Sequence, residues 1–356
     1  MTTEKSTESN NPLGPGYDVQ GKVMRYREVF NQTLRDELNR DPDVFLMGED
    51  ISGGFDKETK EPLDAWGGPF AATKGLVQDF GPDRIRDAPI SEAGFVGAAI
   101  GAALTGLRPV VDLMYFDFVT VAYDQLLSNA AKSRYMFAGQ TKVPITLFAR
   151  SGAGTGHAAQ HSESFYSMLA HIPGLKVVVP SDAYSVRGLL AAAIRDEDPV
   201  FLVNDKKLIN LDGFVPDESY TIEIGKGRYL RRGGDVTLIG MSYTSVTCQK
   251  AAEKLKADGI EAEVVDMLSL SPLDEDIILE SVMKTNKVVV VDEDTPRASM
   301  ASEISAVIAD KAFDYLDAPV KRVTAPHTPV PYNSGLETAF MPQPEDVVGT
   351  VKSILG

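Results

Sequence analysis

The sequence predicts an α/β fold in which a parallel-sheet domain is followed by a smaller α/β domain. Continuous apolar segments, which are typical of strands buried on both faces, alternate with segments of helical periodicity. The expected strands are 44–50, 108–115, 143–150, 175–180 and 199–205, and the expected helices are 27–40, 91–107, 117–137 and 181–198. This alternation favours a parallel sheet covered by helices on both faces. A second series, with strands expected at 235–242, 260–268, 287–294 and 319–326, indicates the smaller domain.

The length of 356 residues also suggests two domains. Residues 1–21 are rich in polar residues, Gly and Pro, and we expect them to form a disordered tail. Residues 22–205 form the first expected domain, residues 206–220 break the alternation as a linker would, and residues 221–356 form the second. Residues 52–70 contain turn residues without periodicity, which predicts a long loop of the kind that often carries function.

The composition excludes several classes of protein. The net charge of −16, without any run of Lys or Arg, argues against nucleic acid as a partner. The longest apolar stretch, 94–107, is too short and too rich in glycine to span a bilayer, so we expect no membrane association. The N-terminus has no apolar segment of the kind found in secretory signals. Cys248 is the only cysteine, which excludes an internal disulfide and fits the cytoplasmic location that we expect.

Glu92 stands at the start of an apolar helix built mostly from small residues. Ser91 suits the N-cap position, and an acid in the first turn is favoured by the helix dipole, so Glu92 has an ordinary structural explanation. Gly94, Gly97 and Gly101 weaken the helix, and their usual benefit is the close approach of another backbone. That approach could be packing within one subunit, a subunit interface, or a cofactor near the helix start.

The glycine-rich segment SGAGTGHAAQHSE, residues 151–163, follows an expected strand and contains His157 and His161. Its glycine spacing does not match GxGxxG and no helix opens directly after it, which disfavours a dinucleotide site. The loop instead indicates a place where histidines meet a ligand at the edge of a sheet, against the alternative of solvated loop histidines. The sequence lacks HExxH, EF-hand and P-loop motifs, and it also lacks a GDG motif followed some 25–30 residues later by Asn, the pattern that holds magnesium and a diphosphate.

These segments together resemble a known family. FLMGED, RDAPISEAGFVGAAIGAALTGLRPV, AYDQLLSNAAKSRYMFAGQ, AAQHSE, HIPGLKVVVPSDAYSVRGLLAAAIRDEDPV and RVTAPHTPVPYN are similar to the β subunits of the thiamine-diphosphate-dependent 2-oxo acid and acetoin dehydrogenases, which are transketolase-like. The resemblance runs from about residue 22 to the C-terminus. It implies a pyrimidine-binding domain followed by a transketolase C-terminal domain. In this family the GDG motif belongs to a separate α subunit, which holds Mg²⁺ and the diphosphate in an assembly of two α and two β subunits.

The resemblance also implies roles for individual residues. Glu92 would hydrogen-bond a ring nitrogen of the aminopyrimidine and so favour the imino tautomer, whose nitrogen removes the proton from thiazolium C2; a carboxylate suits the sharing and relay of a proton. Phe118 would pack against the aminopyrimidine ring, although it also fits an ordinary core. His161 would contact the substrate and assist acyl transfer to lipoamide. Glu49 matches a second acid near the cofactor, with a surface acid at a strand end as the alternative. His157 matches a variable position, and we assign it no catalytic role.

The family often binds a potassium ion in the first domain, mostly through backbone carbonyl groups. The matching residues are Ile145, Ala193, Ile194, Asp196 and Asp198. Asp198 departs from the family, where a neutral residue is common. Oxygen ligands suit such a hard cation, and a plain helix C-terminus is the competing interpretation.

The segments AWGGPF and FDYLDAPVKRVTAPHTPVPYN most resemble acetoin dehydrogenase β subunits, which predicts an enzyme that cleaves acetoin and passes the acyl unit to the lipoyl-bearing acyltransferase core. A pyruvate or branched-chain 2-oxo acid dehydrogenase β subunit is the alternative small-molecule specificity. NDKKLIN departs from the family, which carries an acid near the start and an aromatic near the end of this segment. A non-catalytic transketolase-like scaffold and a nicotinamide dehydrogenase are further alternatives.

Overall fold

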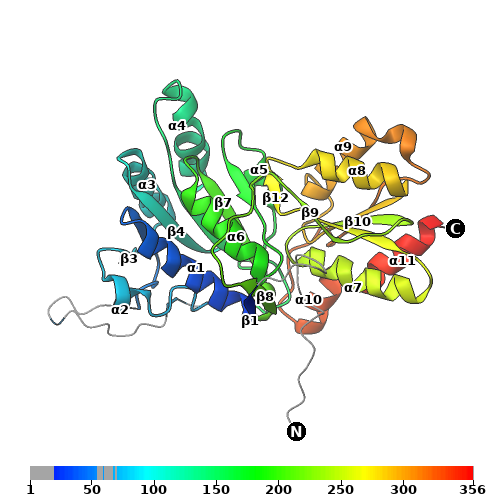
Figure 1. Cartoon of the computed structure of the whole chain (residues 1–356), viewed down its shortest axis with the longest axis horizontal. Coiled ribbons are helices and arrows are strands. Elements are labelled where there is room, and N and C mark those ends of the chain that lie inside the picture. The colour runs from blue at the N-terminus through cyan, green and yellow to red at the C-terminus, as the bar shows by residue number, and fades with distance from the viewer. Residues whose placement is uncertain (1–19, 54–58, 60–66, 69, 356) are drawn as a thin grey trace, which may run out of the picture.

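Two mostly parallel sheets, each sandwiched between helices, form the framework of the molecule (Figure 1). The structure is a computed structural model, and it describes residues 20–53, 59, 67–68 and 70–355. The expected tail and most of the expected loop at 52–70 lie outside the described residues. None of the described helices combines the length and the apolar character needed to cross a membrane.

The first sheet has seven strands within the described residues, in the order β12-β6-β7-β5-β4-β2-β3. Its strands are β2 (Val44–Gly48), β3 (Ile85–Asp87), β4 (Arg108–Tyr115), β5 (Thr146–Ser151), β6 (Lys176–Val178), β7 (Val200–Asp205) and β12 (Ser269–Ser271). The strands from the first half of the chain are mutually parallel, which confirms the predicted parallel sheet, and β12 is antiparallel to β6. The short strand β3 was not predicted.

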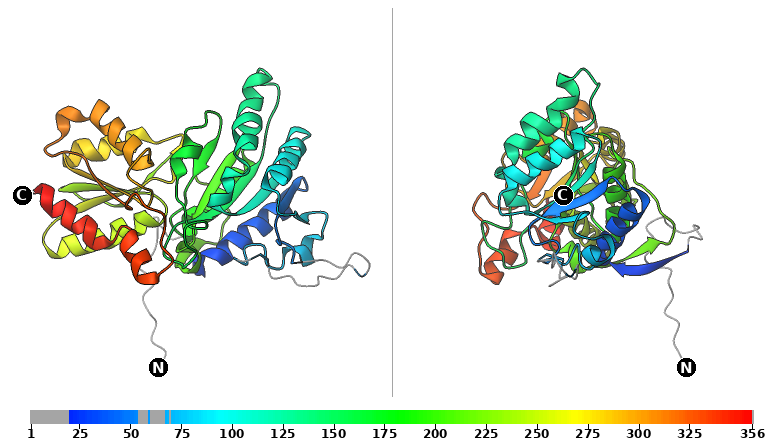
Figure 2. Two further views of the ribbon diagram at one scale, coloured as in Figure 1. Left: turned by 180° about the vertical axis from the view of Figure 1, so that it is seen from behind. Right: turned by 90° about the vertical axis from the view of Figure 1, so that its left-hand side faces the viewer.

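Successive residues of the strands enter different cores, as expected for a sheet buried on both faces. Leu147 and Ala149 of β5 pack on one side, and Phe148 between them packs on the other. The helices of the first domain are α1 (Tyr26–Arg40), α2 (Leu76–Phe80), α3 (Glu92–Leu104), α4 (Ala131–Met136), α5 (Tyr166–Ala170) and α6 (Ala183–Arg195). Helices α1 and α6 cover the face of Phe148, and α3 and α5 cover the opposite face (Figure 2).

The continuous helix predicted for 117–137 is wrong. This stretch is divided into the 3-10 helix η1 (Phe116–Thr120), the π-helix η2 (Gln125–Ala130) and the short helix α4. Val119, Thr120 and Val121 form a β-branched run that disfavours a regular α-helix. The apolar periodicity that suggested the helix has a real cause, because Phe116, Val119 and Leu126 are all buried in the same core.

The second domain contains a five-stranded sheet in the order β14-β13-β10-β11-β9. Its strands are β9 (Arg228–Arg231), β10 (Val236–Gly240), β11 (Ala262–Asp266), β13 (Val288–Asp292) and β14 (Lys321–Thr324). Only β9, at the edge, runs antiparallel to its neighbour. The helical segments of this domain are α7 (Tyr243–Ala257), α8 (Glu275–Thr285), α9 (Met300–Lys311), η4 (Phe313–Tyr315), α10 (Ser334–Phe340) and α11 (Pro344–Leu355). Helices α7 and α11 cover one face of the sheet, and α8 and α9 cover the other.

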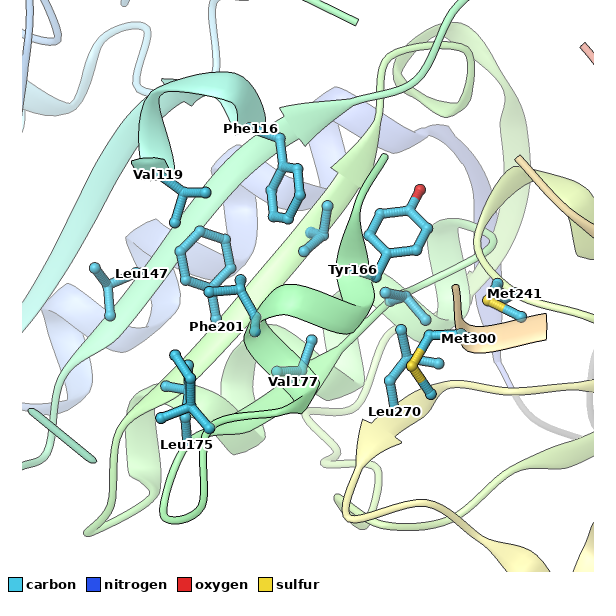
Figure 3. Packing of buried hydrophobic residues seen from close by; sticks show 14 of the residues in the cluster. Phe116, Val119, Leu147, Tyr166, Leu175, Val177, Phe201, Met241, Leu270 and Met300 are labelled. Atoms are coloured by element: carbon cyan, nitrogen blue, oxygen red, sulfur yellow. The ribbon is translucent and has the colours of Figure 1, made fainter. Parts of the chain in front are cut away.

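One hydrophobic core runs across the boundary between the two domains. Phe116, Tyr166 and Phe201 of the first domain belong to the same buried cluster as Met241 and Met300 of the second (Figure 3). Strand β12 extends the first sheet with residues that follow β11 in the chain. The two domains are therefore joined through a shared sheet and a shared core.

The segment 206–220, expected as a linker, also packs against the first domain. It contains η3 (Leu208–Asn210) and strand β8 (Asp212–Pro216), which pairs antiparallel with β1 (Gly21–Arg25). Leu208 is fully buried. The polar and turn residues of the segment obscured this two-stranded ribbon in the sequence.

Candidate active site

The predicted site residues follow neighbouring strands of the first sheet. Glu49 follows β2, Phe118 follows β4, and His161 lies in the loop after β5. Because β2, β4 and β5 are adjacent and parallel, their carboxyl ends meet at one edge of the sheet. Glu92 opens α3, which follows the neighbouring strand β3. The fold thus brings all four predicted residues to the same edge.

Glu92 is the first residue of α3, as predicted, and is 7% exposed. Within the described part of the chain, no group donates a hydrogen bond to its carboxylate. Ser91 occupies the N-cap position, but its side chain makes no capping hydrogen bond, contrary to the simplest expectation. A buried carboxylate with its acceptor oxygens available is suited to a ligand that donates a hydrogen bond.

The three glycines of α3 have different surroundings. A Cβ atom at Gly97 would lie 3.2 Å from the side-chain oxygen of Gln125, so this glycine allows η2 to approach within the same chain. Gly94 and Gly101 lie on the exposed face of the helix. A Cβ atom at Gly94 would lie 2.9 Å from Ser91 Oγ, whereas one at Gly101 would meet no atom within 4 Å, so two of the three glycines serve packing within the chain.

Glu49 lies in an unusual electrostatic environment. Burial, together with repulsion from Glu92, Asp50 and Asp112, raises the pKa of Glu49 to about 7. One of its carboxylate oxygens, Oε1, is buried and has no hydrogen-bond partner. Glu49 and Glu92 thus form a pair of adjacent acids in which Glu49 readily takes up a proton near neutral pH, a property common at functional sites.

A wall of aromatic rings stands at the same edge of the sheet, after β4 and β5. The ring centroids of Phe118 and His161 are 5.5 Å apart, and Tyr115 packs edge-on against His161 with a centroid distance of 4.6 Å. His157 and Phe70 also pack against Tyr115, at 5.6 and 5.3 Å. Sequence reasoning missed Tyr115 and Phe70. Tyr115 ends a predicted strand directly beside Phe118, which was the available signal.

Lys206 holds the loop that carries His161 through hydrogen bonds. It follows β7, the next strand along the sheet, and its Nζ donates hydrogen bonds to the His161 carbonyl and, at 3.1 Å, to the Ser162 hydroxyl. Burial lowers the pKa of Lys206 to about 8, against the opposing attraction of Asp205 and Asp117. The NDKKLIN segment therefore supplies a buried cation that fixes the backbone of His161.

The glycine-rich loop does not have the geometry of a dinucleotide site. The next helix in the chain, α5, begins only at Tyr166, so the loop does not open directly into a helix N-terminus as a dinucleotide-binding loop does. Backbone amides of the loop are instead bonded to Glu293 and Glu337 of the second domain. His157 Nδ1 lies 2.8 Å from the Thr155 hydroxyl oxygen.

The residues predicted to hold potassium lie together at the opposite edge of the sheet, where β5 begins and α6 ends. The backbone oxygens of Ile194 and Asp196 both accept hydrogen bonds from Arg108 Nη1, at 3.2 and 2.9 Å. The Ala193 carbonyl accepts from the Asp196 amide, and the Ile145 carbonyl accepts from Val200. Lys176 binds the Asp196 carboxylate at 2.7 Å, and Arg134 pairs with Asp198. Protein cations already contact this cluster, which lies away from the acids and aromatic rings.

Known proteins match this chain over most of its length. The pyrimidine-binding domain of transketolase matches residues 22–211, and the transketolase C-terminal domain matches residues 225–347. The β subunit of acetoin:2,6-dichlorophenolindophenol oxidoreductase from Bacillus subtilis is 49% identical over 335 residues, covering 94% of this chain and 98% of the relative. Its counterpart from Cupriavidus necator is 45% identical over 94% of this chain and 98% of the relative.

More distant relatives share the same architecture. A mitochondrial pyruvate dehydrogenase E1 component subunit beta-2 from Oryza sativa subsp. japonica is 42% identical over 94% of this chain and 87% of the relative. A split-gene transketolase, described as an inactive β4 tetramer, aligns with a TM-score of 0.73 at 23% identity, covering 93% of this chain and 98% of the other. The chain belongs to the transketolase-like family that includes the β subunits of acetoin oxidoreductase and of the pyruvate dehydrogenase E1 component.

Proposed function

We propose that this chain is the β subunit of a thiamine-diphosphate-dependent dehydrogenase that cleaves acetoin and passes the acyl unit to lipoamide. The observation that carries the proposal is that Glu49 and Glu92, whose charges interact, stand at the same edge of the sheet as the packed rings of Phe118 and His161. The 49% identity to an acetoin oxidoreductase β subunit favours acetoin as the substrate. Pyruvate is the second candidate, because an E1 component β subunit is 42% identical.

The residues present fit the aminopyrimidine end of the cofactor. Glu92 offers a buried carboxylate without a donor among the described residues, and Glu49 offers a buried oxygen without a partner. Such carboxyl groups suit an aminopyrimidine, because an ionised carboxylate accepts a hydrogen bond from the amino group and a protonated carboxyl group donates one to the ring nitrogen. When bound, the thiazolium ring of thiamine diphosphate supplies a carbon nucleophile that attacks a carbonyl group.

Each residue of the chain then has a distinct task. Glu92, when it carries a proton, would donate a hydrogen bond to the ring nitrogen of the aminopyrimidine and exchange that proton with it. Its location at the start of a rigid helix fixes the direction of that bond. Phe118 offers a flat apolar face to the ring. His161 lies beside Phe118 and reaches the substrate side, where it binds the substrate oxygen and assists transfer to lipoamide.

The diphosphate and Mg²⁺ require a partner, and we propose an α subunit in an assembly of two α and two β chains that serves a lipoyl-bearing acyltransferase core. Support comes from exposed apolar side chains around α3 and α4. Ile90 is 85% exposed, Tyr135 is 89% exposed, and Met136 and Phe137 are 60% and 57% exposed. Large apolar side chains grouped in this way are typical of interfaces.

Within this proposal residues 22–205 bind the aminopyrimidine, residues 221–356 form the C-terminal domain, and residues 206–220 connect them. We further propose a cytoplasmic location, which suits a chain with a single, buried cysteine.

We also propose a structural potassium ion at Ile145, Ala193, Ile194, Asp196 and Asp198. Its support is that the carbonyl groups of Ile145, Ala193, Ile194 and Asp196 lie together where β5 begins and α6 ends; Arg108, which bonds two of them, would have to withdraw when the ion binds. If potassium binds there, the melting temperature should be higher in KCl than in equimolar choline chloride. An equal melting temperature in the two salts contradicts the cation site.

Reconstitution tests the function directly. The chain, its α partner, thiamine diphosphate and Mg²⁺ should reduce dichlorophenolindophenol with acetoin, whereas the chain alone should be inactive. Glu92→Gln should lower turnover by at least about 10²-fold, in line with losing a positioned acid–base group, while the subunits still assemble. Glu28→Gln is a matched control, because Glu28 is also a first-turn acid but belongs to α1 and is exposed.

The alternatives give different results in the same assay. Faster turnover with pyruvate than with acetoin would assign the chain to the E1 class. Assembly without activity toward either substrate would support a non-catalytic scaffold. Near-normal activity of Glu92→Gln would refute the proposed proton relay.

A further inference from the structure

The glycine-rich loop that carries the histidines is held by carboxylates from the other domain. Four consecutive backbone amides, those of residues 153–156, point at two side chains of the second domain. The Ala153 amide donates to Glu293 at 2.8 Å. The Gly154 and Thr155 amides donate to Oε1 of Glu337 at 2.6 and 3.1 Å. The Gly156 amide donates to both oxygens of Glu337, at 3.2 and 3.0 Å.

The glycines of this loop are required by that arrangement. Gly152, Gly154 and Gly156 have φ values of +92°, +95° and +75°, in the left-handed region that other residues rarely adopt. A Cβ atom at Gly152 would lie 2.4 Å from a carboxylate oxygen of Asp205. The left-handed backbone turns successive amides toward the same side, as in the concave anion-binding sites formed by peptide groups. The SGAGTG motif is thus explained by an internal carboxylate.

Glu337 differs from Glu293 in how its charge is satisfied. Glu293 pairs with Lys207 at 2.9 Å. Glu337 is 2% exposed, and no Lys or Arg among the described residues lies within ion-pair distance of it. Its charge is met by the loop amides, and hydrogen bonds to a charged acceptor are about twice as strong as neutral ones. Glu337 therefore depends on the loop conformation, and the loop depends on Glu337.

An apolar contact reinforces the same junction. Ala153 is fully buried in a small cluster with Ala325, Val330 and Phe340 of the second domain. The loop thus inserts one side chain into the second domain while its amides receive the carboxylate. These contacts come from α10 and the segment before it, close to the C-terminal end of the chain.

The anchored segment leads directly to the proposed catalytic histidine. At its far end Lys206 donates a hydrogen bond to the His161 carbonyl. Between the two anchors the Thr155 hydroxyl lies 2.8 Å from His157 Nδ1, and the His161 ring packs on Tyr115. Glu337 and Lys206 thus hold the loop on either side of residues 157–160. If the Glu337 contacts are lost, Lys206 alone holds this segment at one end, and the His161 ring becomes more mobile.

We propose that Glu337 is a positioning residue for His161: the second domain fixes the catalytic loop through this carboxylate. The proposal rests on the proposed function, since it assumes that His161 acts on the substrate. It assigns to the C-terminal domain a part in the active site of the same chain, in addition to its part in packing.

The test compares Glu337→Gln and Glu337→Ala with wild type in the reconstituted enzyme. The turnover number should fall by about 10-fold for Gln and about 10²-fold for Ala, the range expected when a reacting group is misplaced by about 1 Å. The thiamine diphosphate concentration for half-maximal activity should remain unchanged, because Glu92 and Phe118 lie outside the loop. Hydrogen exchange of the peptide containing 153–163, measured on the chain alone, should accelerate at least 10-fold.

Asp182→Asn is the matched control. Asp182 also joins the two domains through a carboxylate, which binds Arg228 at 2.8 Å, but it caps α6 and does not contact the loop. This variant should lose thermal stability while it keeps wild-type turnover and wild-type exchange in 153–163.

The outcomes separate the two proposals. If wild type is active, His161→Ala is impaired and Glu337→Ala keeps wild-type turnover, the positioning role is refuted although the function stands. Unchanged exchange in 153–163 for Glu337→Ala also refutes it, without reference to activity. If wild type is inactive with every substrate, the proposed function fails, and the exchange data still report on the loop.

Discussion

A buried ion pair lies directly behind the aromatic wall of the site. Asp112 of β4 and Arg150 of β5 form a salt bridge in which the side chains are only 4% and 3% exposed. The Asp112 carboxylate also accepts the Met114 amide at 2.8 Å. The Arg150 guanidinium lies over Phe70 and Phe148, at 4.8 and 4.9 Å from their ring centroids. We predict that Asp112→Ala is strongly destabilising.

The magnitude follows from what remains after the substitution. Arg150 stays charged, buried and without its partner, and breaking such a pair typically lowers the free energy of unfolding by about 3–5 kcal/mol. At about 2–4 °C per kcal/mol for domains of this size class, the melting temperature should fall by roughly 6–20 °C. Replacing both residues, as in Asp112→Leu with Arg150→Met, removes the unpaired charge. The free energy of unfolding that the double variant loses should be smaller, by about 1–3 kcal/mol, than the sum of the losses in Asp112→Leu and in Arg150→Met.

Urea unfolding of the isolated chain, followed by circular dichroism, measures each loss. Arg25→Ala serves as the control, because the Arg25–Asp212 pair is 40% and 60% exposed and such pairs contribute at most about 1 kcal/mol. A loss below about 1 kcal/mol for Asp112→Ala, or strictly additive single and double variants, would show that the pair is not energetically coupled and would refute the reasoning.

Three further variants probe other positions of the chain. The pKa of Glu49 is raised from 4.5 to about 7 in the folded chain. As the pH rises from 4.5 to 7, Glu49 therefore ionises more readily in the unfolded chain, and the folded state loses stability. Glu49→Gln should raise the melting temperature at pH 8 but not at pH 4. Gly174→Ala should lower the free energy of unfolding in urea by about 2–5 kcal/mol. The left-handed backbone at this position costs a residue other than glycine about 1–2 kcal/mol. The added Cβ would also lie 2.2 Å from the Ala131 carbonyl oxygen, and such overpacking costs about 1–3 kcal/mol. Lys207→Met should cost about 3–5 kcal/mol in urea unfolding at pH 8, because it leaves Glu293 charged, buried and without its cation; a loss below about 1 kcal/mol would contradict this.

The inner strands of both sheets could be predicted because their residues are apolar on both faces. Leu147 and Phe148 enter different cores, and this environment leaves a continuous apolar run in the sequence. The short strand β12 and the ribbon of β1 and β8 could not be found in this way, because their pairing partners are distant in the chain and only a few residues take part. Periodicity also could not distinguish an α-helix from the 3-10 and π turns of 116–130, since the same apolar side chains face the core in either case.

The site was predictable to a similar extent. Glu92 and His161 stand in motifs whose residues are contiguous, and the structure brings both to the edge where Glu49 and Phe118 lie. Glu337 gave no signal, because its function depends on a contact with amides that lie 181–183 positions earlier in the chain. Backbone amides are present at every residue except proline, so only the glycines that orient them could have indicated this contact in the sequence.

The strand β12 limits where this chain can be recombined with its relatives. Residues 269–271 belong to the second half of the sequence but complete the sheet of the first domain. A chimera joined at the boundary between the two matched domains, near residue 225, would insert a foreign edge strand beside β6. Exchange of the whole second domain therefore also requires a β6 that pairs with the new β12. The two domains of this chain are not independently exchangeable modules.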